Sequence, residues 1–290
     1  ADGLRPAAVA QEFLGMRRIG ARAGMTVAIA ALLSVALFPI YWMALTALRP
    51  KSVTMVWPPR LLPDPNSLSL GSVIAVLRDT PALGWAGNSL LIAVLTTIAV
   101  VIVSTLAGYA LSRAEGGAAR GLGTVILVAK MLPATLLVVP LYVMFHRAGL
   151  LGGPLAVVLA NLAFAAPFAT WMMKGFFDGI PPAIEEAALL DGCGHLGALW
   201  RVAIPLALPG TAAVALYAFI VAWNDFLFAR AFLPGGAVTT LTVGATQFLS
   251  ETEMEWNRVM AVSLLATLPV GAVFLWLQRH FVGGLTQGHN

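Results

Sequence analysis

Charged residues are scarce in this chain. Lys, Arg, Asp and Glu make up 10% of its 290 residues, whereas they make up roughly 25% of a typical soluble domain. Hydrophobic residues make up 59%, and the mean hydropathy is +0.88. A soluble fold of this length could not cover so much apolar surface, so the composition excludes a soluble globular protein and predicts an integral membrane protein.

Several kinds of chemistry are also missing. The single cysteine, Cys193, cannot form an intrachain disulfide, and the four histidines are spread along the chain without metal-ligand spacing. The sequence contains no G-x-S-x-G or H-E-x-x-H motif, and no glycine-rich phosphate loop ending in Gly-Lys-Ser/Thr. It therefore predicts neither an enzyme nor a bound cofactor, and any ATP-driven function must take its energy from another chain.

Long apolar runs dominate what is present. In hydrocarbon every backbone N–H and C=O must be paired internally, so runs of this length predict helices that cross the bilayer. The predicted fold class is all-α, with six transmembrane helices at residues 25–48, 86–111, 122–145, 154–174, 209–232 and 258–278.

Six crossings place both termini on one side of the membrane. Lys and Arg are almost evenly divided between the two sides, but Arg17, Arg18 and Arg22 directly precede the first run and favour cytoplasmic termini. The other cations are scattered over loops, which fits membrane lipids and not nucleic acid as their partner. The prediction is a cytoplasmic segment 1–24, a transmembrane domain 25–278 with external loops 49–85 and 233–257, and a cytoplasmic tail 279–290.

The connection at residues 175–208 carries clear helix punctuation. Pro181 and Pro182 suit a first helical turn, and Gly192 can take the left-handed conformation that ends the helix. A second short helix is predicted at about 194–203, running on to Pro205. Two short helices joined by a glycine corner suit docking into a cleft of a partner; the alternative is an amphipathic hairpin lying on the membrane surface.

The spacing within this loop resembles a known motif. Glu186-Ala187-Ala188, Gly192 four residues later, and Val202 to Pro205 after nine more resemble the EAA motif of binding-protein-dependent ATP-binding-cassette (ABC) importer permeases. Further stretches resemble the sugar-importing branch of that family, typified by the maltose permease subunit MalG. They are Asn88–Leu90, Pro140–Tyr142, Trp171–Phe177, Trp223–Phe226 and Gln278–Gly288, and the likeness covers roughly residues 25–288.

The resemblance implies a type I ABC importer permease-like fold with a cytoplasmic coupling helix held by an ATPase. The residues it assigns to this contact are Glu185, Glu186, Ala187, Ala188, Asp191, Gly192 and Pro205. It also implies that Thr286, Gln287 and Gly288 touch the ATPase dimer and that loop 233–257 reaches the external binding protein. Cys193 and Gly194 depart from the family pattern, which often has Ala and a polar residue there.

The same resemblance implies partners. They are a second, MalF-like permease subunit, two ATPase subunits that bind ATP and Mg, and an external or lipid-anchored substrate-binding protein. The expected substrate is a sugar or related polyol, and the expected location is the plasma membrane of a prokaryote.

Two ionisable residues, Lys130 and Asp225, lie inside apolar runs. Counted from the cytoplasmic face, their depths differ by about 10 Å, which is too far for a direct ion pair. Lys130 either lines an inner vestibule or reaches back to the interface, and Asp225 either packs an outer gate or contacts substrate. With Met131, Asn161 and Asn224 they form the candidate path or gate, although polar side chains in membrane bundles usually bond neighbouring backbone.

Two other functions fit the sequence less well. An ion-gradient-driven secondary transporter of a small polar solute would favour ionisable groups at the midplane of two matching halves, and the sequence has no such internal repeat. A membrane-embedded enzyme would need a convergent catalytic set, which two separated ionisable residues do not supply. The secondary transporter remains the alternative.

Overall fold

The computed structural model describes residues 5–54, 56–114, 116–249 and 254–286, and within them it is nearly all helical. One isolated β-bridge joins Leu249 and Met254. The helices are α1 (Arg5–Ala47), α2 (Lys51–Thr54), α3 (Gly71–Asp79), α4 (Ala82–Arg113), α5 (Gly117–Ala129), α6 (Ala134–Arg147), α7 (Pro154–Asp178), α8 (Pro182–Leu190), α9 (His195–Ala198), α10 (Ile204–Leu206), α11 (Leu208–Trp223), α12 (Leu227–Phe232), α13 (Leu241–Ala245) and α14 (Trp256–Thr286).

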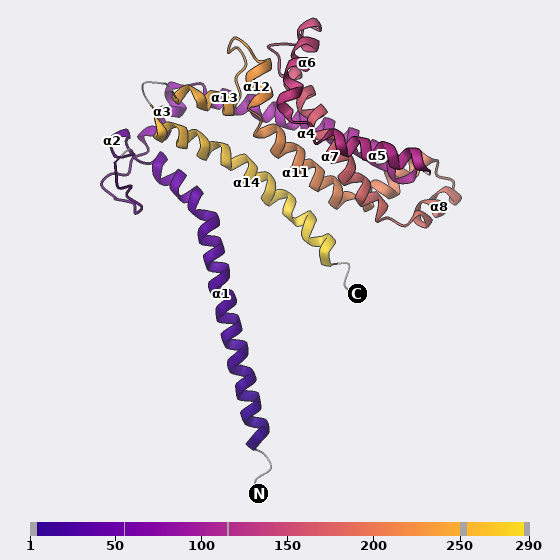
Figure 1. Cartoon of the computed structure of the whole chain (residues 1–290), viewed down its shortest axis with the longest axis horizontal. Coiled ribbons are helices and arrows are strands. Elements are labelled where there is room, and N and C mark those ends of the chain that lie inside the picture. The colour runs from indigo at the N-terminus through magenta and orange to yellow at the C-terminus, as the bar shows by residue number, and fades with distance from the viewer. Residues whose placement is uncertain (1–4, 55, 115, 250–253, 287–290) are drawn as a thin grey trace.

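A bundle of long helices forms the body of the molecule. Helix α4 packs along α7 and α11, and α14 packs against α11 and α1 (Figure 1). Helices α4 and α7 approach closely at Gly108, where an added Cβ would lie 2.7 Å from Met173 Cβ and 2.9 Å from Lys174 N. Small residues at such crossings let helix backbones touch, which is how membrane helices gain packing without a hydrophobic driving force between them.

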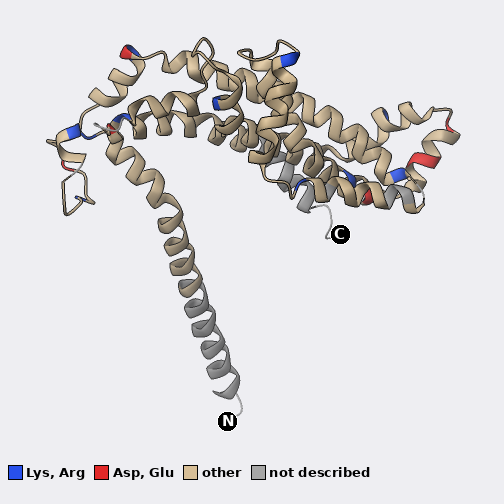
Figure 2. Ribbon diagram, turned by 45° about the horizontal axis from the view of Figure 1, so that its top comes forward, with Lys and Arg blue, Asp and Glu red and all other residues tan. Residues whose placement is uncertain are grey.

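The bundle buries parts of its central helices and leaves other helix faces apolar and open. Ala93, Val100 and Ala169 are fully buried, whereas Leu32 and Val35 of α1 are 70% and 74% exposed. The most apolar window of α1 has no buried residue, and Figure 1 shows this helix leaving the bundle. Charged residues lie mainly toward the ends of the helices (Figure 2). This distribution suits a protein whose surroundings are lipid and other membrane helices.

Four helices are long and apolar enough to cross a membrane, and a fifth span results if the bent pair His195–Leu206 and Leu208–Trp223 is counted as one. The all-α membrane class predicted from the sequence is therefore confirmed. The count of six crossings stays a prediction.

Two of the six predicted runs are not continuous helices. The run 122–145 is divided into α5 and α6, because Pro133 has no N–H and disfavours helical backbone at the residue before it. The run 209–232 is interrupted after Trp223 and resumes at Leu227. The predicted boundary at residue 24 also falls inside a helix, since α1 starts at Arg5.

Candidate functional site

The loop between α7 and α11 begins with α8, whose two ends are set by its own sequence. Pro181 precedes the helix and Pro182 is its first residue, where the missing N–H has no intrahelical bond to lose. At the other end, Gly192 has a φ of +89°, and the N–H of Cys193 donates to the carbonyl of Ala188 at 3.0 Å. This left-handed corner closes α8 in the manner typical of a helix-ending glycine.

The second limb of the loop returns the chain to the bundle. Helix α9, a π-helical turn (Leu199–Ala203) and α10 follow one another directly, and the chain then bends by 77° into α11. The π turn lies just before Pro205, which has no N–H to offer the carbonyl four residues back. Ala198, Leu199 and Ala203 are buried, and the last two belong to the apolar core that includes α7 and α11. The limb is therefore seated on the bundle.

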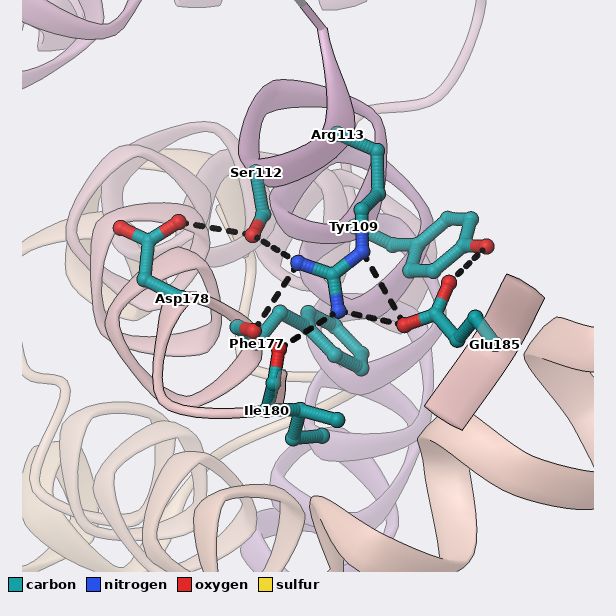
Figure 3. A network of polar contacts seen from close by, with 7 residues as sticks. All are labelled: Tyr109, Ser112, Arg113, Phe177, Asp178, Ile180 and Glu185. Atoms are coloured by element: carbon teal, nitrogen blue, oxygen red, sulfur yellow. Dashed lines mark hydrogen bonds and ion pairs between the residues drawn. The ribbon is translucent and has the colours of Figure 1, made fainter. Parts of the chain in front are cut away.

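Glu185 fixes α8 to the end of α4. Its carboxylate accepts hydrogen bonds from Tyr109 Oη at 2.8 Å and from Arg113 Nε at 3.0 Å, and Arg113 Nη2 forms an ion pair with it (Figure 3). Only 8% of the Glu185 side chain is exposed. A carboxylate this buried is tolerated because both of its oxygens are paired, and removing one partner would leave a charge without compensation.

Arg113 also binds the end of α7. Its Nη1 donates to the Phe177 carbonyl at 3.1 Å, and its Nη2 donates to the Ile180 carbonyl at 3.2 Å (Figure 3). Carbonyls at the C-terminal end of a helix lack the full set of N–H partners and carry partial negative charge, so a guanidinium stabilises them. One side chain of α4 thus joins three elements, α4, α7 and α8, and we call Arg113 with Tyr109 and Glu185 the joint.

A more exposed group of polar side chains flanks the joint. Ser112 Oγ donates to Asp178 Oδ1 at 2.7 Å, and Lys174 Nζ lies 2.6 Å from Asp178 Oδ2. The Asp178 side chain is 44% exposed, so water screens this ion pair and its contribution to stability is small. The joint is buried and is therefore screened less by water than this outer pair.

The charge of Glu185 is set by two opposing effects. Burial by itself raises the pKa of Glu185, but hydrogen bonds from Arg113 and Tyr109 and the charge of Arg113 outweigh it, so the pKa lies below its ordinary value of 4.5. The carboxylate is therefore ionised at neutral pH, which keeps the joint closed.

The opposite side of the loop is open. Of the residues assigned to it from the sequence, Glu185 is buried, Ala188 is half-buried, and Glu186, Ala187, Asp191, Gly192 and Pro205 are exposed. Adjacent residues on a helix point about 100° apart, which is why neighbouring glutamates face opposite environments. Three large apolar side chains nearby are also exposed, Leu190 by 89%, Leu196 by 72% and Trp200 by 63%. We call these exposed residues the outer face of the loop, and exposure of this kind marks a contact surface.

Two of the three residues of the joint, Tyr109 and Arg113, are not predicted from the sequence. The sequence assigns no role to them or to Ser112, because Arg113 looks like an ordinary cation at the end of an apolar run. The partners Arg113 and Glu185 are 72 residues apart, so no local spacing links them. The one signal available is a pair of adjacent glutamates in a short amphipathic helix, of which one must face the bundle.

The two intramembrane ionisable residues have separate partners, as the sequence predicts. Lys130 Nζ lies 3.3 Å from the centroid of the Phe164 ring and donates to the Phe164 carbonyl at 3.3 Å. Asp225 accepts hydrogen bonds from the N–H groups of Phe228 at 3.1 Å and Ala229 at 2.9 Å, which caps the start of α12. Asp225 thus stabilises the start of α12, and Lys130 contacts α7 from the break between α5 and α6.

Of the other path candidates, Asn161 lies within hydrogen-bonding reach of the Asp225 carboxylate, whereas Met131 and Asn224 face other surroundings. Asn161 is buried and donates to the Val157 carbonyl at 3.0 Å, and Met131 is 80% exposed. Asn224 donates to Ile220 and lines a cavity of about 410 Å³ together with hydroxyl groups of Thr242, Ser263 and Thr267. The structure therefore brings Asn161 and Asp225 together but does not gather all five candidates into one site.

The structure describes only part of the predicted C-terminal contact with the ATPase. Thr286 is the last residue of α14, and Gln287 and Gly288 lie outside the described residues. In the part of the chain that the structure describes, no group of three His, Cys, Asp or Glu side chains is placed to hold a metal ion.

Residues 101–287, which include the joint and the loop, match the family profile described as binding-protein-dependent transport system inner membrane component. The chain belongs to this family. As an inner membrane component of such a system, it is a multi-pass membrane protein and a transport subunit, not a catalytic one.

Relatives extend this family assignment over nearly the whole chain. The inner membrane ABC transporter permease protein YcjP of Escherichia coli (strain K12) is 33% identical over 94% of this chain and 97% of its own length. The trehalose/maltose transport system permease protein MalG of Thermococcus litoralis is 31% identical over 88% and 91%. The resemblance to sugar-importer permeases seen in the sequence is therefore confirmed.

The fold is shared with a solved permease structure. A chain from the crystal structure of a bacterial ABC transporter involved in the import of the acidic polysaccharide alginate superposes with a TM-score of 0.74 at 23% identity, covering 91% of this chain and 97% of that one. The permease-like fold predicted for this inner membrane component is therefore present.

Proposed function

We propose that this chain forms half of the transmembrane pathway of an ABC importer for a sugar or related polyol, and that energy from ATP enters it through residues 181–205. The observation that carries the proposal is the two-sided loop. Its inner side is fixed to the bundle by the joint, and its outer face exposes Glu186, Leu190 and Trp200. A partner that grips the outer face would therefore move the bundle with it.

The proposal assigns the loop to a cleft of an ATPase subunit. Ala187 and Ala188 keep one side of α8 thin, so another backbone can approach it closely, and the exposed apolar side chains can be buried in such a contact. ATP-driven closure of the ATPase pair would then pull the loop, and the attached helices would rotate so that the pathway opens to the other side. With this assignment, the loop and residues 1–24 and 279–290 lie in the cytoplasm.

The complete transporter would contain further chains. Two ATPase subunits bind ATP and Mg, a second MalF-like permease completes the pathway, and an external or lipid-anchored binding protein delivers the solute to the side of loop 233–257. A relative named for the transport of trehalose and maltose supports a sugar as the solute. By the family resemblance, the proposal also assigns Thr286, Gln287 and Gly288 to a contact with the ATPase pair.

Reconstitution tests this proposal. The chain is co-expressed with the three partner types, purified in mild detergent and placed in liposomes, and uptake of labelled di- and oligosaccharides is measured with ATP or with an imposed ion gradient. We expect co-purifying ATPase subunits and uptake that requires ATP. Uptake driven by the ion gradient in the absence of ATPase subunits would refute the proposal, and would restore the secondary transporter that the family membership disfavours.

A further inference from the structure

Helix α4 is bonded at its two ends to two different loops. Its C-terminal end holds the α8 loop through the joint. Its N-terminal end holds α13, which belongs to the loop predicted to be external: Asn88 Nδ2 donates to the Thr239 carbonyl at 3.0 Å, and Ser89 Oγ accepts the N–H of Leu241 at 2.8 Å. Figure 1 shows α13 and α8 near opposite ends of the molecule, with α4 running between them.

The contact between α4 and α13 is as closely fitted as the joint. Ser89 and Trp85 are each only 3% exposed. A Cβ added to Gly244 of α13 would lie 2.3 Å from the Trp85 ring, so the backbone of α13 rests directly on that side chain. Hydrogen bonds in such a buried setting are costly to break, so α13 must move when the start of α4 moves.

The helix between these two contacts is built to stay straight. It contains 32 residues without an internal proline, which at 1.5 Å per residue is about 48 Å. By contrast, α7 contains Pro167, and α11 meets the α8 loop through a bend of 77°. Proline and sharp bends are where helices absorb motion. Among the described helices, α4 therefore offers the stiffest connection between the two loops.

We infer that α4 acts as a connecting rod that transmits movement of the α8 loop to the α13 loop, with Arg113 and Ser89 as positioning residues at its two ends. The inference rests on the proposed role of the α8 loop. Because coupling between two sites is reciprocal, an event at α13 alters the α8 loop by the same free energy as an event at the α8 loop alters α13.

A pair of reporter positions tests the inference in the complete transporter. In a Cys193→Ser background, one fluorophore is attached at Leu190→Cys in the α8 loop and, in a second preparation, at Ala237→Cys beside α13; both positions are exposed. A non-hydrolysable ATP analogue is added in lipid nanodiscs. We expect both reporters to respond in the otherwise unaltered chain. In the Arg113→Gln variant, we expect the Leu190 reporter to keep its response and the Ala237 reporter to lose it.

The matched control lies in the middle of the same helix. Thr97 Oγ1 bonds only to the Ala93 carbonyl within α4, so Thr97→Ala should leave both responses unchanged. Ser89→Ala removes the hydrogen bond between Ser89 Oγ and the Leu241 N–H at the opposite end of α4, with a small change in side-chain volume. It should also abolish the Ala237 response, and it provides the test if Arg113→Gln does not assemble.

The outcomes separate the two proposals. If the Leu190 reporter does not respond even without further substitutions, the proposed role of the α8 loop is wrong. If the Leu190 reporter responds but Ala237 responds equally with and without Arg113 and Ser89, the loop proposal stands and the connecting rod is overturned. A merely structural role of Arg113 would lower thermal stability without uncoupling one reporter from the other.

Discussion

Gly192 provides the sharpest test of how the α8 loop works. Its φ of +89° is a left-handed conformation, and a Cβ added there would meet no atom within 4 Å. Substitution therefore changes only the backbone preference. For an L-residue this conformation costs roughly 1–2 kcal/mol, which corresponds to a factor of about 5–30 in the population of the native corner. A β-branched residue is less tolerant still of positive φ.

The assay measures uptake per ATP hydrolysed by the reconstituted transporter. We expect Gly192→Ala to lower this ratio and Gly192→Val to lower it further, while ATP hydrolysis by the partner continues. The matched control is Gly194→Ala, because Gly194 is also exposed with open space around it but has a φ of −75°. Equal ratios for Gly192→Val and the unaltered chain would refute the reasoning that a rigid corner transmits the movement.

Three other substitutions test the structure at different points. Because the pKa of folded Glu185 lies below 4.5, the stabilisation from the joint is complete above about pH 4.5 and is lost as pH falls through the folded pKa. The difference in Tm between the unaltered chain and Glu185→Gln in detergent should therefore shrink on acidification. A Tm difference that stays constant with pH would contradict this role of the Glu185 charge. Gly108→Ala should destabilise the bundle by about 1–3 kcal/mol, because its Cβ would overlap Met173 and Lys174. The control is Gly87→Ala on the same helix, whose Cβ meets no atom within 4 Å and which should not destabilise the bundle. Equal melting curves for these two variants would count against the close approach of α4 and α7. Asp225→Ala should cost about 0.5–2 kcal/mol through loss of the α12 cap, and Asp225→Asn, which keeps an acceptor oxygen, should retain uptake; loss of uptake without loss of stability in Asp225→Asn would instead indicate contact with the solute.

The interrupted spans show where hydropathy stops being informative. A window of apolar residues reports that a segment lies in lipid, but it does not report whether the backbone runs straight through it. Pro133 breaks one run locally, whereas the break after Trp223 depends on Asp225 finding the N–H groups of α12. The first kind of break has a local cause that can be read from a proline; the second requires the folded arrangement.

Solvent class and helix boundaries in this chain follow from local properties of neighbouring residues. Composition fixes lipid as the solvent, Pro181 and Pro182 start α8, and Gly192 ends it, because solvation and backbone preference act on neighbouring residues. The inward orientation of Glu185, the outward orientation of Glu186 and the ion pair with Arg113 depend instead on how the helices pack in three dimensions. The ion pair joins residues far apart in the chain, and its energy depends on a burial and a geometry that exist only once α4, α7 and α8 have packed together.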